Sequence, residues 1–103
     1  MAKYWTLTDA EIESALQELK DWSFAGGKLE AAFVFASFRD AVAFLVRAAF
    51  EAEALDHHPE LSNVYNRVSF ALSTHDAGDC VTDLDLELAR RISAVASGFA
   101  RAG

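Results

Sequence analysis

Apolar residues recur every three to four positions in three segments of the chain, which is the spacing of helices with one buried face. The first segment follows Thr8 and Glu11, a pair spaced to cap a helix start, and predicts a helix over residues 9–20. Another segment follows a similar capping pair, Thr82 and Asp85, and predicts a last helix that runs to the glycines near the end of the sequence.

The middle segment predicts the longest helix. From Ser37, a residue type common at N-caps, the chain stays rich in helix-forming apolar residues until Pro59. Proline disfavours the helical conformation at the residue before it, so we expect this helix to end near Asp56 or His57. Its apolar positions cover a wider arc than one buried face requires, and the surplus favours self-association.

Two other regions have the pattern of strands. Gly26 and Gly27 separate two apolar runs, which favours a tight hairpin because both glycines can take positive φ. The second run, residues 29–35, is apolar on both faces and predicts a strand that is interior or covered on both sides. Residues 64–75 alternate as a strand with a bend or bulge at Asn66, so this region is expected to hold one or two strands. Strands joined by short connections between helices indicate an α+β fold with an antiparallel sheet and helices on one face.

Length and composition fit one domain over residues 1–103, because apolar residues make up 52% of the chain and charged residues 24%. The formal net charge is −7 and no cluster of Lys and Arg occurs, so direct binding to nucleic acid or to an anionic membrane is disfavoured. The longest apolar run falls short of the ~20 residues that span a bilayer, and the N-terminus lacks a signal-peptide pattern. We expect no membrane partner.

Cys80 is the single cysteine, which rules out an intramolecular disulfide and fits a reduced, cytoplasmic setting. A nucleophilic or redox role would need an activating base beside the thiol, and the neighbouring sequence offers none. We therefore interpret Cys80 as a loop residue.

All three histidines and the only proline fall within one short stretch. Glu53 precedes His57 by one helical turn, so its carboxylate can contact that imidazole, and the C-terminal end of the helix also favours the protonated ring. Pro59 keeps His58 out of the helix, so the adjacent side chains diverge and can hold opposite parts of a ligand. His75 arrives at the end of a strand, a common place for sites. The set predicts acid and base chemistry near neutral pH.

A zinc site is the sharpest alternative, because three histidines with Glu53 or Asp56 would supply enough ligands. Against zinc, adjacent histidines followed by proline are poorly placed to bind one ion, and the helical His pair at i, i+4 of zinc motifs is absent. Another alternative is that the histidines fill ordinary surface or core positions. Metal-free acid and base chemistry accounts for their clustering better than either.

The run HHPELSNVYNRV, followed by LSTH, resembles the signature of the pterin-4a-carbinolamine dehydratases. A motif of this length and mixture is far more specific than a short glycine pattern. The similarity covers most of the chain. Further matching positions are LTDAEI near the N-terminus, Trp22, Phe33, Val34, Phe35, Phe38, Ala41, Phe44, Thr82, Asp85, Leu88 and Ala89.

The resemblance implies a four-stranded antiparallel sheet with three helices. It also implies a dehydratase that converts 4a-hydroxytetrahydropterin to quinonoid dihydropterin and water, without metal or organic cofactor. Such enzymes recycle the pterin used by aromatic amino acid hydroxylases, which would be the functional partner, and they form homodimers or homotetramers. The main alternative is a non-catalytic dimerisation or assembly-factor module of the same fold. The three retained histidines favour the enzyme.

By the same resemblance, the catalytic histidines are His57, His58 and His75, and Asp85 is the acidic residue that supports them. The expected substrate-binding positions are Glu53, His57, His58, Pro59, Ser73, Thr74, His75 and Asp76. We expect His57 and His75 to exchange protons with the substrate and His58 mainly to hold the pterin.

Three features depart from the family pattern. The loop after His75 is slightly longer than usual. Leu84 stands where some relatives carry an arginine, so an ion pair of that kind is not available here. Leu61 replaces an aromatic residue that is common after the HHPE sequence, which would alter the rim of the pocket or the packing of subunits.

Overall fold

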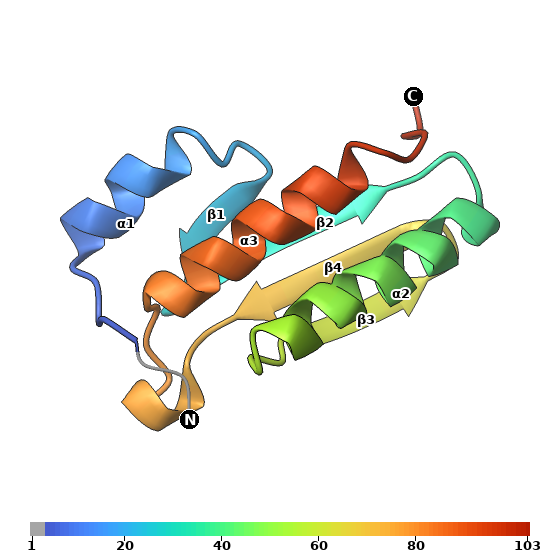
Figure 1. The fold of residues 1–103 in the computed structure, drawn as a ribbon. Coiled ribbons are helices and arrows are strands. Elements are labelled where there is room, and N and C mark those ends of the chain that lie inside the picture. The colour runs from blue at the N-terminus through green and yellow to red at the C-terminus, as the bar shows by residue number, and fades with distance from the viewer. Residues whose placement is uncertain (1–3) are drawn as a thin grey trace.

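The computed structural model describes residues 4–103, which form three helices packed on one face of a four-stranded antiparallel sheet (Figure 1). The elements are α1 (Asp9–Leu16), β1 (Trp22–Ala25), β2 (Lys28–Val34), α2 (Phe38–Ala54), β3 (Glu60–Val64), β4 (Arg67–Leu72), the 3₁₀ helix η1 (His75–Ala77) and α3 (Asp83–Ala96). The strand order is β1-β2-β4-β3, so α2 carries the chain from β2 to the far edge of the sheet. This architecture confirms the predicted α+β class.

The first hairpin forms as predicted, because both turn glycines adopt left-handed conformations, with φ of 60° at Gly26 and 78° at Gly27. β2 pairs with β1 on one side and β4 on the other, which confirms its interior place. Leu29 and Phe33 are buried on the face that the helices cover, whereas Glu30 is exposed on the opposite face. That second face of the sheet is therefore open in the single chain.

Of the one or two strands expected here, two form, and the prediction that residues 64–75 alternate as a single strand was wrong. The chain makes a hairpin there, in which β3 and β4 pair through a turn at Tyr65 and Asn66. Tyr65 has a φ of 50°, and the Asn66 side chain donates to the Phe35 carbonyl at 2.9 Å, which fixes the turn against the end of β2. β3 was missed because its residues are mostly exposed on both faces and lack the alternation that marks a half-buried strand.

The first helix is shorter than predicted. The capping box of Thr8 and Glu11 forms, but α1 ends at Leu16 and not near residue 20. Single turns follow, in which the Leu19 amide donates to the Leu16 carbonyl at 3.1 Å and the Leu19 side chain enters the core. α3 begins with its predicted capping box and ends at Ala96.

Aromatic side chains fill the space between the sheet and the helices. Phe44 of α2 lies against Phe35 and Phe33, with ring centroids 4.7 Å and 5.3 Å apart. Phe70 of β4 meets Phe44 edge to face at 5.8 Å. Aromatic packing of this kind fixes α2 over the end of the sheet, and the C-terminal end of α2 carries the adjacent histidines.

Replacing Gly27 by alanine tests the first turn. A Cβ there would meet no atom within 4 Å, so the only cost is the left-handed backbone. We expect Gly27→Ala to lower the free energy of unfolding by about 1–2 kcal/mol in urea titrations. The matched control is Gly98→Ala, where φ is ordinary and the nearest atom is 3.5 Å away, so stability should be unchanged or raised. Equal losses in both variants would contradict this explanation.

Candidate active site

The end of α2 determines where His57 points. After the C-cap at Leu55, Asp56 adopts a left-handed conformation with a φ of 49°, and the His57 amide donates back to the Ala52 carbonyl at 3.0 Å. This bond pattern closes the helix and turns the chain sharply. The helix therefore ends slightly earlier than predicted, and His57 lies beyond it as a buried residue.

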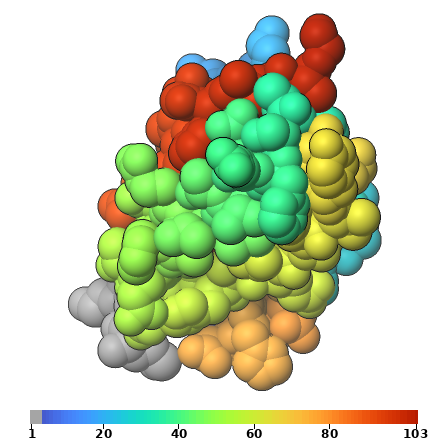
Figure 2. Space-filling view, turned by 90° about the vertical axis from the view of Figure 1, so that its right-hand side faces the viewer, coloured from blue at the N-terminus to red at the C-terminus, as the bar shows by residue number. Residues whose placement is uncertain are grey.

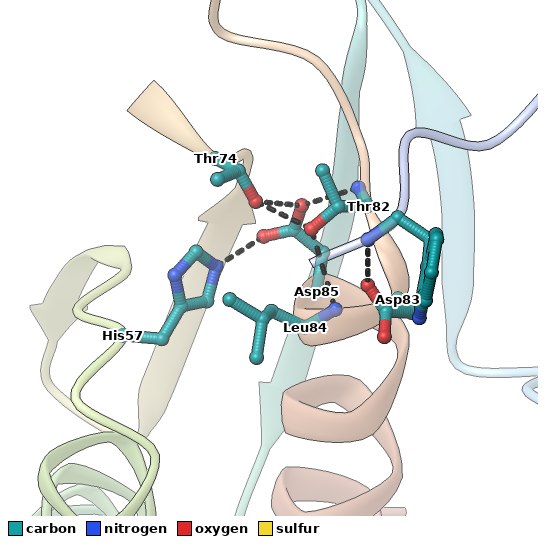
Figure 3. Close-up of polar contacts among 7 residues, drawn as sticks. His57, Thr74, Thr82, Asp83, Leu84 and Asp85 are labelled. Atoms are coloured by element: carbon teal, nitrogen blue, oxygen red, sulfur yellow. Dashed lines mark hydrogen bonds and ion pairs between the residues drawn. The ribbon is translucent and has the colours of Figure 1, made fainter. Parts of the chain in front are cut away.

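His57 contacts a fully buried carboxylate, Asp85, through Nε2 and Oδ1 at 2.5 Å (Figure 3). The other carboxylate oxygen accepts from the Thr74 hydroxyl at 2.9 Å and from the Thr82 amide at 2.8 Å. Because Thr74 gives its proton to Asp85, the Thr82 hydroxyl is the donor in the 2.7 Å contact between the two threonines. Every donor in this cluster is thereby matched to an acceptor.

Asp85 has this position because it also caps a helix. It is the third residue of α3, and its bond from the Thr82 amide is half of the predicted capping box. A negative charge is stabilised at the N-terminal end of a helix. The same carboxylate thus caps the start of α3 and accepts a hydrogen bond from His57 Nε2. Nδ1 of the neutral ring then remains available to take up a proton.

A cavity of about 240 Å³ lies beside this cluster. Six of its lining residues are among the predicted site residues: His57, His58, Ser73, Thr74, His75 and Asp76. Three further lining residues were not predicted as such: Tyr4, Asp56 and Leu84. Glu53, Pro59 and Asp85 are not among the lining residues, and Asp85 reaches the cavity only through His57 and Thr74.

The predicted contact between Glu53 and His57 was wrong. The Glu53 carboxylate instead contacts Nε2 of His58 at 2.8 Å, and both side chains are exposed. The prediction assumed that the helix continues to His57, which would place the two residues one turn apart. Because the left-handed Asp56 ends the helix first, His57 turns inward to Asp85 and His58 is left beside Glu53.

His75 also lies in a different element from the one predicted. It begins η1 and does not end the strand, and its side chain is 90% exposed. Nδ1 of His75 contacts the Asp79 carboxylate at 3.1 Å. Asp79 belongs to the lengthened loop, which a bridge between Thr74 and Cys80 closes. The departure from the family pattern therefore supplies His75 with an acidic neighbour.

Tyr4 reaches the cavity from the other end of the chain. Its hydroxyl donates to the Asp76 carbonyl at 3.1 Å, across 72 positions of sequence. No local pattern around Tyr4 signals this contact, since residues 4–8 form no helix or strand of their own. Leu84 was noted as a departure from the family pattern, and the structure adds that it lines the cavity.

A larger hollow of about 550 Å³ lies on the open face of the sheet. Short side chains such as Ala32, Ser69 and Ala71 line it. It contains no histidine, so we assign the site to the smaller cavity. Within residues 4–103, no three His, Cys, Asp or Glu side chains are grouped in a way that would hold a metal ion. In the same part of the chain, none of the helices has the length and hydropathy of a membrane span.

Comparison with known proteins identifies the family. Residues 6–95 match the family model described as pterin 4 alpha carbinolamine dehydratase. A protein of Opitutus terrae that carries this enzyme's name is 56% identical over 89 residues, which cover 86% of this chain and 92% of the relative. Another from Solibacter usitatus is 47% identical over 92 residues, covering 89% and 96% respectively.

A solved structure from Brucella melitensis, described as a transcriptional coactivator/pterin dehydratase, superposes with a TM-score of 0.83 at 41% identity. The match covers 89% of this chain and 99% of that one. Sequence and fold therefore agree over the region that holds the histidine cavity. The chain belongs to the pterin-4-alpha-carbinolamine dehydratase family, a family of hydro-lyases.

Proposed function

We propose that this chain dehydrates 4a-hydroxytetrahydropterin to quinonoid dihydropterin by histidine general acid and base catalysis. Family membership supports pterin carbinolamine dehydratase activity. The observation that carries the mechanism is the His57–Asp85 pair beside a cavity that two further histidines line. A buried carboxylate that orients an imidazole is a recurring arrangement for proton transfer.

The reaction needs two proton movements at neighbouring atoms. The hydroxyl oxygen on C4a gains a proton and leaves as water, while N5 loses its proton as the C4a–N5 double bond forms. Protons and charge balance without an external reagent. His57 and His75 both line the cavity, one held by Asp85 and one beside Asp79. We assign one as the acid and the other as the base, with His58 holding the pterin.

Exposure separates the three histidines in a way that suits these roles. His57 is buried and fixed, His75 is almost fully exposed, and His58 is exposed but paired with Glu53. A fixed imidazole presents its free nitrogen to the substrate in one orientation, whereas an exposed one exchanges protons readily with water. After each turnover, both histidines regain their starting protonation by exchange with water in the emptied cavity. The product would re-enter the pterin pool that aromatic amino acid hydroxylases use.

Replacing the two histidines tests the mechanism. We expect His57→Ala and His75→Ala each to lower kcat by about 10²–10⁴-fold, because each loses a proton-transfer group. His58→Ala should mainly raise KM. The measurement is the absorbance change of freshly made 4a-hydroxytetrahydropterin, with and without a chelator. Wild-type turnover that survives the chelator supports the proposal, and unaltered turnover in both His57→Ala and His75→Ala would refute it.

Asp85 acts through His57 and is therefore a positioning residue in this proposal. Its carboxylate holds Nε2 of His57, so it sets which ring nitrogen carries the proton. An asparagine side chain at position 85 cannot accept hydrogen bonds from His57, Thr74 and the Thr82 backbone together, because its NH2 group is a donor. The ring would lose its fixed orientation even where the fold survives.

We expect Asp85→Asn to lower the free energy of unfolding by about 1–3 kcal/mol, since a buried donor loses its acceptor. Turnover should fall as well, and the NMR signal of the His57 Nε2 proton should shift or disappear. The matched control is Asp79→Asn, which alters the exposed pair with His75 and should change stability by at most ~0.5 kcal/mol. A stable Asp85→Asn variant with an unshifted His57 signal would contradict the assigned role.

A protein-association role is the second candidate, and the surface of α2 favours it. Phe38, Val42, Val46 and Phe50 follow one another at four-residue spacing, with exposed fractions between 37% and 66%. Figure 2 shows the side chains of α2, coloured teal to lime, across the middle of this face. Residues four apart form one ridge on a helix, and such ridges interdigitate with those of a partner helix.

We propose that a second copy of the chain covers this stripe. Its order, Phe-Val-Val-Phe, reads the same in both directions. Two antiparallel copies related by a twofold axis would therefore place each Phe38 near a Phe50 and each Val42 near a Val46. Self-association of this kind is compatible with the dehydratase and equally with a dimerisation module.

Val46→Glu tests the self-association by placing a charge in the middle of the stripe. We expect the wild-type chain to sediment as a dimer or larger species and Val46→Glu to sediment as a monomer, because a buried unpaired carboxylate is strongly disfavoured. Ala94→Glu, at an exposed position of α3, adds the same charge outside the stripe and should leave the mass unchanged. Equal masses for wild type and Val46→Glu would exclude this surface as the interface.

A further inference from the structure

The segment before α1 is fastened across the start of α3. The Trp5 amide donates to the Asp83 carboxylate at 2.5 Å, and the Asp83 amide donates to the Trp5 carbonyl at 3.1 Å. The Leu7 amide adds a bond to the Val81 carbonyl at 3.3 Å. Figure 1 shows this dark-blue segment beside the orange loop that leads into α3. The backbone on the C-terminal side of Tyr4 is therefore fixed to the loop that carries the capping box of Asp85.

The side chain of Tyr4 is held at its other end as well. Its hydroxyl donates to the Asp76 carbonyl in η1, directly after His75. The ring between these two attachments is half-buried and lines the cavity. A side chain fixed by its backbone and by its tip loses little conformational freedom when a ligand arrives, so its contacts contribute more to affinity.

The chemistry of the cavity makes this ring stand out. Among the lining residues in the described chain, Tyr4 and Leu84 alone bring a large apolar surface, and Tyr4 alone brings a benzene ring. The other lining residues offer imidazole, carboxylate, hydroxyl and backbone groups. Ligand sites usually combine apolar walls with a few polar groups, and here the walls depend on two side chains.

A pterin has matching demands. The edges of its fused rings carry amide, amine and ring nitrogen groups, which the polar lining residues can bind. Its flat faces carry π electrons and need an apolar or aromatic surface. We propose that Tyr4 is a substrate-binding residue whose ring packs against a flat face of the pterin. The proposal rests on the pterin specificity proposed above and assigns a role to a residue outside the histidine motifs.

The test is the affinity for an oxidised pterin that cannot be dehydrated, followed by the quenching of the pterin's own fluorescence. We expect Tyr4→Ala to raise Kd by about 3- to 10-fold, the range of one aromatic contact, and Tyr4→Phe to stay within about twofold. Turnover should show the same pattern, with KM raised in Tyr4→Ala and kcat within about twofold of wild type. Trp5→Ala is the control, because the Trp5 side chain is 74% exposed and its backbone bonds remain.

The outcomes separate this inference from the proposed function. A wild-type chain that binds the pterin without turning over the carbinolamine would end the catalytic proposal, while weaker binding by Tyr4→Ala would still support a role for the ring. Equal affinity in wild type and Tyr4→Ala would overturn the role of Tyr4 alone. Equal loss in Tyr4→Phe and Tyr4→Ala would overturn it too, because the hydroxyl bond to Asp76 and not the ring would then matter. Absence of pterin binding in the wild type would overturn both.

Discussion

The carboxylate of Asp85 has no contact with solvent, and yet it joins three parts of the fold. It accepts hydrogen bonds from His57 at the end of α2, from Thr74 after β4 and from the backbone that starts α3. A buried charge is tolerated only where donors replace the water it has lost. The position of each of these segments therefore depends on the other two, and the orientation of His57 is fixed by the same bonds that hold the fold together.

The parts of the fold that follow from local chemistry could be predicted from the sequence. Both capping boxes, the N-cap at Ser37 and the paired glycines of the first hairpin act within a few residues, and each forms as expected. β3 could not be predicted in this way. An edge strand that is exposed on both faces has no alternation, because burial on one side is what selects apolar residues at every second position.

The residues of the site also fall into those that sequence patterns predicted and those that depend on the folded chain. The clustered histidines and their resemblance to a known motif predicted six of the residues around the cavity. Helical spacing paired His57 with Glu53, and only the family resemblance indicated Asp85. The spacing failed because Asp56 ends α2 with a left-handed backbone, a conformation for which aspartate carries only a weak preference. Tyr4 was missed because its contact with Asp76 bridges 72 positions, a distance over which no sequence pattern acts.

These long spans bear on the order in which the molecule assembles. The hairpins of the sheet join residues that are neighbours in sequence. In contrast, the Trp5 backbone bonds to Asp83 across 78 positions, and His57 contacts Asp85 across 28. Contacts between distant residues require the closure of long loops and form later than local ones. During synthesis, Tyr4 and Trp5 emerge well before Asp76 and Asp83 and remain without these partners until both have been made. A partly folded intermediate can therefore have both hairpins and still lack the pocket.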